Sequence, residues 1–197
     1  MIVFAAVRGR TRSKRAVLGC LTTLSLASLY RTAWADDILV NVGAGPQPGA
    51  DQRNETWGLD YSFYQLKRSD RQHIEVGVSY TSLRTNGPGN GSTVALSVYP
   101  QITLYPAKTS RIAARSPAWA EPFFFARALA PSYISENGLG SRQQAEHFAF
   151  QAQVGVGVIV NSRAIVAVSW KHFSNANLYD DNDGIDVPLV VNVGVRF

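Results

Sequence analysis

The strongest fold signal in this chain lies in residues 147–158, which read HFAFQAQVGVGV. Apolar side chains occupy every second position from Phe148 to Val158, and mostly small or polar residues occupy the positions between them. Side chains alternate between the two faces of a β-strand with this period of two residues. The same pattern recurs in residues 57–63 and 74–80. These stretches therefore predict β-strands that each have one long apolar face.

Five further segments bring the number of candidate strands to eight, most of them roughly 9–12 residues long, as in small outer-membrane barrels. The five are residues 37–44, 94–105, 122–135, 163–172 and 187–197. After residue 35 the chain has no apolar run of 18 residues, so membrane-spanning helices are excluded.

The connections between these strands alternate in length. Long ones cover 45–55, 81–93, 136–146 and 174–186, and short ones cover 67–71 and 161–162. Bacterial outer-membrane barrels have long loops outside the cell and short turns in the periplasm. The exception is the connection 106–121, which should be periplasmic and is long. We predict an all-β fold, an eight-stranded antiparallel transmembrane β-barrel.

Alternation alone does not separate a membrane barrel from a water-soluble one, because it leaves open which face points outward. Three features favour the membrane. The polar positions are mostly small and uncharged, as a narrow packed lumen requires, and aromatic residues such as Trp57 and Trp170 lie near strand ends. The chain also ends on an alternating apolar strand with Phe197 as its last residue, which resembles the terminal signature of outer-membrane barrels.

Residues 1–35 are predicted to be a secretory signal peptide, leaving residues 36–197 as the barrel. A basic segment, an apolar segment of about 15 residues and the sequence Ala33-Trp34-Ala35 follow one another in the order such a peptide requires. This leader contains six basic residues and no acidic one, so the net charge of +5 falls to −1 without it. A nucleic-acid partner is therefore excluded. The single cysteine, Cys20, also lies in the leader, so the barrel contains no thiol.

A histidine and a serine are the first candidates for chemistry. His172 continues the lipid-facing positions of its strand, and Ser174 shares that face if the strand extends so far. An ionisable ring on this face is costly unless it serves a function, and imidazole next to a hydroxyl is the pairing that a serine hydrolase needs. The loop that follows offers four acids, Asp180, Asp181, Asp183 and Asp186, without a choice among them. A solvated acidic turn is the plainer interpretation.

Residues 170–178, WKHFSNANL, followed by 182–186, NDGID, resemble the motif of the PagL family of outer-membrane lipid A 3-O-deacylases. The resemblance implies Ser174 as nucleophile, His172 as general base and Asp186 as the acid, where the family usually has Glu. Asp183 is the alternative acid. The resemblance also implies that Asn175, Asn177 and Asn182 are candidates for binding the oxyanion or the substrate.

The function implied is an esterase that removes the ester-linked 3-hydroxyacyl chain from the 3-position of lipid A in the outer leaflet, without metal or cofactor. Three basic residues expected in outer loops, Arg53, Arg84 and Arg142, are candidate contacts for lipid A phosphates. The alternatives are a non-catalytic structural or adhesive outer-membrane barrel and an outer-membrane phospholipase. Acyl-chain preference, latency and oligomeric state, including a homodimer, stay open.

Overall fold

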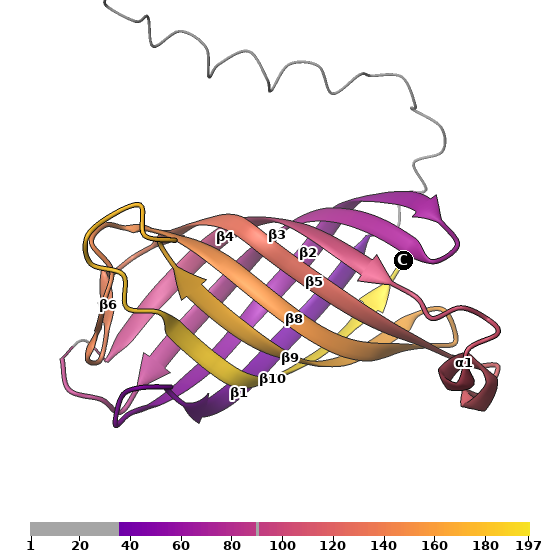
Figure 1. The fold of residues 1–197 in the computed structure, drawn as a ribbon, viewed down its shortest axis with the longest axis horizontal. Coiled ribbons are helices and arrows are strands. Elements are labelled where there is room, and N and C mark those ends of the chain that lie inside the picture. The colour runs from indigo at the N-terminus through magenta and orange to yellow at the C-terminus, as the bar shows by residue number, and fades with distance from the viewer. Residues whose placement is uncertain (1–35, 90) are drawn as a thin grey trace, which may run out of the picture. The chain divides into compact units, whose positions relative to one another are not determined.

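The computed structural model describes residues 36–89 and 91–197, which form a closed antiparallel barrel of eight strands (Figure 1). In chain order the strands are β1 (Asp37–Pro46), β2 (Arg53–Ser69), β3 (Gln72–Thr85), β4 (Ser92–Leu104), β5 (Ala120–Ile134), β8 (Phe148–Val160), β9 (Ala164–Ser174) and β10 (Ile185–Arg196). Each strand pairs with its neighbours along the chain, and β1 pairs with β10 to close the ring. Closure leaves no strand edge unpaired, as a membrane-embedded sheet requires.

Three short elements lie outside the barrel wall and were not predicted from the sequence. The strands β6 (Gly138–Leu139) and β7 (Arg142–Gln143) form a small hairpin in the β5–β8 connection. The helix α1 (Arg111–Arg115) lies in the β4–β5 connection, and the Ser110 side chain caps it by accepting a hydrogen bond from the Ala113 amide. No helix within the described ranges is long and apolar enough to cross a membrane.

The apolar face of the strands points outward, so this is a membrane barrel and not a water-soluble one. On β9, Val166, Val168 and Trp170 are exposed, whereas the residues between them are buried. Exposed valine, leucine and aromatic side chains continue this wall over the other strands. Such a continuous apolar surface is stable only against lipid.

The interior also holds charged groups among the mostly small and uncharged residues that the sequence pattern predicted. The Arg127 guanidinium contacts the Asp60 carboxylate at 3.1 Å, and both side chains are at least 97% buried. Lys171 donates to the side-chain oxygens of Asn41 and Thr81, at 3.1 and 3.2 Å. Charged groups fit a barrel interior when each has partners of this kind.

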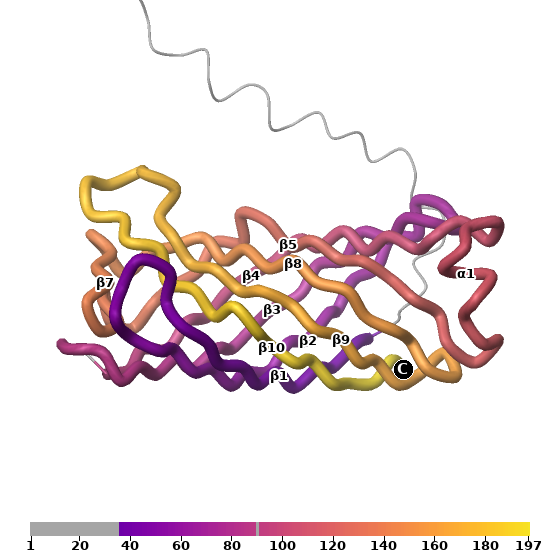
Figure 2. Tube along the Cα trace, turned by 60° about the horizontal axis from the view of Figure 1, so that its bottom comes forward, coloured from indigo at the N-terminus to yellow at the C-terminus, as the bar shows by residue number. Residues whose placement is uncertain are grey.

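The first and last residues of the barrel, Asp36 and Phe197, lie at one end, where the Phe197 backbone amide donates to the Asp36 carbonyl. The tight β2–β3 and β8–β9 turns and α1 lie at this end, and the β9–β10 connection and the β6–β7 hairpin lie at the other (Figure 2). Several strands run further than predicted. Arg53 and Arg84, expected in loops, are strand residues, and Asp186, expected in the loop, lies in β10.

Candidate functional site

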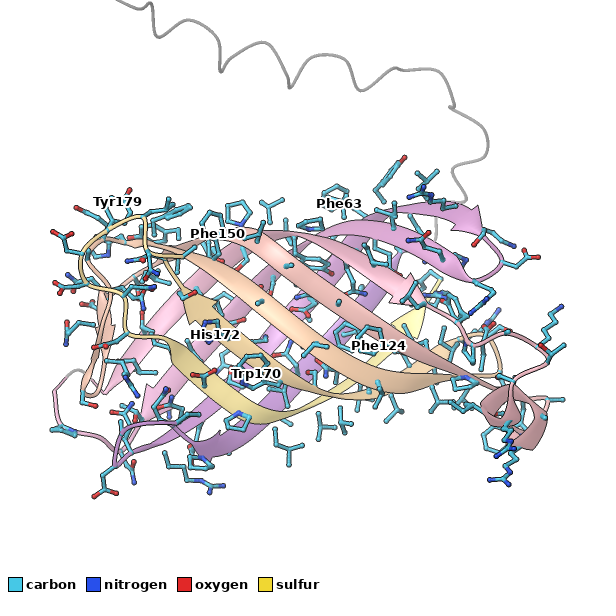
Figure 3. The ribbon with its side chains drawn as sticks, viewed as in Figure 1. Phe63, Phe124, Phe150, Trp170, His172 and Tyr179 are labelled. Carbon is cyan, nitrogen blue, oxygen red and sulfur yellow. The ribbon has the colours of Figure 1, made fainter. Side chains whose placement is uncertain are left out.

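The centre of the candidate site is a contact between neighbouring strands. His172 on β9 lies directly opposite Asp186 on β10, and the imidazole Nδ1 is 2.9 Å from the carboxylate Oδ1. His172 lies beside Trp170 on the outer surface of the barrel, toward the end with the β9–β10 connection (Figure 3). The two rings are 5.5 Å apart between centroids. A carboxylate at Nδ1 fixes the ring and leaves Nε2 for chemistry.

A bulge in β10 gives Asp186 this position. Between Val187 and Val190 the β10 strand advances three residues while β9 advances two, from Lys171 to Ser169. Without the bulge, Val187 would lie opposite His172, and Asp186 would point toward the lumen. Bulges re-aim side chains in this way, and Pro188 suits one because it has no backbone amide hydrogen to pair. The alternation of side chains along a regular strand is therefore not enough to predict which face of β10 carries Asp186.

Gln47, at the end of β1, holds the second carboxylate oxygen. Its side-chain amide donates to Asp186 Oδ2 at 3.1 Å, and its Oε1 accepts the Asp186 backbone amide at 2.8 Å. Asn54 donates to the same Gln47 oxygen and to the Asp186 carbonyl, and Gln52 donates to Asn54. All three amide side chains are buried. Sequence reasoning missed them because it treated 45–55 as an outer loop; three carboxamides within eight residues were the available signal.

Gly184 lets the β9–β10 connection pass close to the histidine ring. A β-carbon built on Gly184 would lie 2.6 Å from His172 Cε1, which is far inside van der Waals contact. Any larger residue would therefore displace the imidazole. The connection and the Asp186 contact together restrict the ring to one orientation.

Ser174 is the last residue of β9 and lies two positions beyond His172 on the same face, half-buried. Its hydroxyl forms no hydrogen bond with any residue in 36–89 or 91–197, and neither does His172 Nε2. Residues with this spacing lie about 7 Å apart along a strand. The structure thus brings His172 and Asp186 into contact and leaves Ser174 beside them. Hydrogen bonds to a nucleophile often form only when substrate is bound.

The three candidate asparagines bond mainly to one another. The Asn175 backbone amide donates to Asn182 Oδ1 at 2.8 Å, and Asn182 Nδ2 donates to Asn177 Oδ1 at 2.7 Å. Asn177 has a φ of 59°, in the left-handed region that asparagine tolerates better than most residues. Asn175 Nδ2 donates to the Asp181 carbonyl. These contacts organise the turn after Ser174, and a role at the oxyanion stays a prediction.

Asp183, the alternative acid, faces a different part of the molecule. Its carboxylate lies 3.6 Å from the Arg142 guanidinium and accepts the Gln143 backbone amide at 3.2 Å. It therefore joins the β9–β10 connection to the β6–β7 hairpin, and Asp186 is the acid in contact with His172. Within the described ranges, no group of three or more His, Cys, Asp and Glu side chains is arranged to hold a metal ion.

Comparison with known proteins gives a family model and several solved structures, among them an outer-membrane enzyme and a surface protein. The family model described as lipid A 3-O-deacylase (PagL) matches residues 28–196. The crystal structure of the outer-membrane enzyme PagL aligns with a TM-score of 0.59 at 19% identity, over 81% of this chain and 98% of that one. Neisserial surface protein A aligns with a TM-score of 0.54 at 12% identity, over 85% of this chain and all of that one. No curated protein matches. The chain is an outer-membrane β-barrel and belongs to the lipid A 3-O-deacylase (PagL) family.

Proposed function

We propose that this protein hydrolyses the ester that links a 3-hydroxyacyl chain to the 3-position of lipid A, with Ser174 as the nucleophile. The observation that carries the proposal is the His172–Asp186 contact on the lipid-facing side of the barrel, at the end away from the termini. In an outer-membrane barrel with periplasmic termini, that end meets the outer leaflet. Lipid A occupies this leaflet, so the substrate ester lies at the level of the site.

The reaction proceeds in two acyl-transfer steps. His172 Nε2 accepts the Ser174 proton as Oγ attacks the ester carbonyl, and the same proton passes to the sugar 3-oxygen when the ester bond breaks. Water, deprotonated by His172, then attacks the acyl-serine and releases the 3-hydroxy acid, while the proton returns to Ser174. Asp186 stabilises the imidazolium in both steps. When Ser174 attacks, negative charge develops on the ester carbonyl oxygen. The turn formed by residues 175–177 directly follows Ser174 and is our candidate for stabilising this oxyanion.

Substrate reaches the site from the membrane and not through the barrel. The interior cavity among Asp60, Glu75 and Arg127 has a volume of about 30 Å³. That is room for about two water molecules and far too little for an acyl chain. His172 and Trp170 instead face outward, so lateral diffusion brings the lipid to them.

Basic residues at the outer rim are proposed to bind the lipid A phosphates. Arg53 and Arg84 line a cavity of about 250 Å³ at the paired ends of β2 and β3, together with Glu55, which lies opposite Arg84. Arginine binds phosphate with two parallel hydrogen bonds, which gives orientation as well as affinity. Arg142 is less suited to this role because its guanidinium already contacts Asp183.

The test is the identity of the acid released by the purified protein in detergent micelles. With lipid A as substrate, gas chromatography with mass spectrometry should detect a 3-hydroxy fatty acid, and Ser174→Ala should lower kcat by about 10³-fold or more. Ser82→Ala is the matched control, because Ser82 is also half-buried on the outward-facing positions near the outer end of a strand. If the protein releases unsubstituted fatty acids from glycerophospholipid and no acid from lipid A, a phospholipase is favoured instead. If it releases no acid from either lipid, a non-catalytic barrel is favoured.

We also propose that residues 1–35 are removed on export as a signal peptide. This segment lies outside the described residues, and the proposal rests on its sequence. Amino-terminal sequencing of the protein recovered from outer membranes should begin at Asp36. A sequence that begins within the first 35 residues would refute the cleavage site.

A further inference from the structure

The long connection between β4 and β5 is basic and uncovered. Residues 106–119 contain three cations, Lys108, Arg111 and Arg115, and no acidic residue. None of the residues of α1 is buried, and Ile112 and Trp119 are 63% and 57% exposed. A connection that exposes an isoleucine on a helical turn, a tryptophan after it and three cations is poorly suited to water. It is well suited to the boundary between acyl chains and phosphate headgroups.

An apolar groove lies between this connection and the barrel wall. It has a volume of about 370 Å³ and is lined by Ile112 from α1, by Leu104, Phe124 and Val156 from the wall, and by Arg71. The three wall residues are exposed members of the lipid-facing surface. The groove is therefore continuous with the surface that acyl chains already cover.

Arg71 supplies an unpaired cation beside this groove. It lies in the β2–β3 turn, where its carbonyl accepts the Tyr105 amide at 2.9 Å, so the turn is fastened to the start of the basic connection. Its guanidinium forms no ion pair or hydrogen bond with the residues in 36–89 and 91–197. The neighbouring Asp70 is already paired with Lys67 at 2.7 Å. Arg71 is thus free to bind an external anion.

We propose that this groove binds one glycerophospholipid of the inner leaflet, with an acyl chain between Ile112 and the wall and the phosphate paired with Arg71. Groove and cation lie at the end that carries both termini, which faces the periplasm. The apolar part of the groove, which is continuous with the lipid-facing wall, suits an acyl chain. The Arg71 guanidinium, which also lines the groove, suits the charged phosphate of the same lipid. Arg111 and Arg115 then lie over the surrounding headgroups.

Native mass spectrometry of the delipidated full barrel in detergent micelles tests this proposal. Titration with phosphatidylglycerol should give one retained adduct at low lipid concentration, and Arg71→Ser and Ile112→Ser should each weaken it at least about tenfold. Arg163→Ser and Val98→Ser are the controls. Arg163 is an exposed cation at the same end, and Val98 is an exposed wall residue outside the groove. Both control variants should bind like the unmodified protein.

Two further ligands separate the parts of the proposal. Diacylglycerol with the same chains lacks the phosphate and should bind at least about tenfold more weakly, and inorganic phosphate should not displace the lipid. Equal binding of diacylglycerol, displacement by phosphate, absence of a retained adduct, or equal effects of test and control variants would each overturn the proposal. Heat-modifiable mobility in gel electrophoresis verifies that every variant is folded.

Discussion

The Asp186 carboxylate is held through both of its oxygens, Oδ1 by His172 and Oδ2 by Gln47. Because Asp186 lies directly opposite His172 across a strand pair, a short side chain is long enough to reach the imidazole. Gln47 fixes which carboxylate oxygen faces the ring, and we infer that it is a positioning residue.

Gln47→Ala should lower kcat about 10- to 100-fold with little change in KM. Hydrogen bonds to charged groups contribute about 1.5–3 kcal/mol, and each 1.4 kcal/mol corresponds to a factor of ten. Gln47 is buried behind the carboxylate, so binding of the lipid should be affected little. Steady-state kinetics on lipid A in micelles provide the measurement, with the exposed Gln143→Ala as control. An unchanged kcat for Gln47→Ala would show that His172 orients Asp186 without help.

Gly184→Ala should lower activity at least about tenfold while the barrel still folds. The new β-carbon would lie 2.6 Å from His172 Cε1, so the ring must rotate away from Asp186 or the connection must move. Orientation errors of this size commonly cost a factor of ten or more. In Gly91→Ala, by contrast, the β-carbon meets nothing closer than 3.9 Å. Equal activities of the two variants would argue against a fixed ring orientation.

At the level of elements, two features set the position of Asp186. The bulge in β10 turns its side chain toward His172, and Gln47, the residue after β1, bonds its second carboxylate oxygen. The alternation of residues 147–158 and its counterparts was enough to predict the eight strands, the lipid-facing side of His172 and the order of long and short connections. It could not predict the face of Asp186, because a bulge is an exception to alternation. Nor could it predict Gln47, Gln52 and Asn54, because their role depends on register between strands that are far apart in sequence.

The contact between Asp60 and Arg127 in the interior could not be predicted for a related reason. Asp60 and Arg127 occupy inward positions on β2 and β5, and nothing local to either strand indicates that they meet. Their contact joins two strands that are separated in the ring by β3 and β4. Pairing across the lumen follows from closure of the barrel and is not visible in any single segment.

Arg127→Met should destabilise the barrel by about 3–5 kcal/mol, because it leaves Asp60 buried without its ionic partner. It also removes the guanidinium that lies 3.4 Å from the centroid of the Tyr99 ring. Urea unfolding of the barrel in lipid vesicles, followed by tryptophan fluorescence, gives the free energy. Lys67→Ala removes an ion pair that is exposed to water and should leave the stability nearly unchanged. Equal stabilities of the two variants would mean that the interior pair contributes no more than the exposed one.

On the scale of the whole molecule, the two proposed lipid sites lie at opposite ends of the barrel. The proposed catalytic site faces lipid at the end with the β9–β10 connection. The proposed phospholipid groove, lined by Ile112 of α1, lies at the end with α1 and the β2–β3 turn (Figure 2). Between them the lumen is filled by buried polar and charged side chains, among them Asp60, Arg127 and Lys171. The outer surface of the barrel, and not its interior, therefore contacts the proposed lipid substrate.

The filled lumen predicts that the protein does not conduct ions. Single barrels inserted into planar bilayers should show no steady conductance, whereas a general porin in the same apparatus provides the positive control. The physical reason is that buried side chains fill the lumen, where the cavity among Asp60, Glu75 and Arg127 has a volume of only about 30 Å³. A stable conductance at low voltage would contradict this view of the interior.

Mass spectrometry of lipid A from cells that express the protein tests the central claim most directly. The host is chosen so that its own lipid A retains the 3-linked chain. Cells with the unmodified protein or Ser82→Ala should yield lipid A that has lost one 3-hydroxyacyl chain, and cells with Ser174→Ala or His172→Asn should yield intact lipid A. Loss of the chain with Ser174→Ala, or intact lipid A with the unmodified protein folded in the outer membrane, would contradict the account.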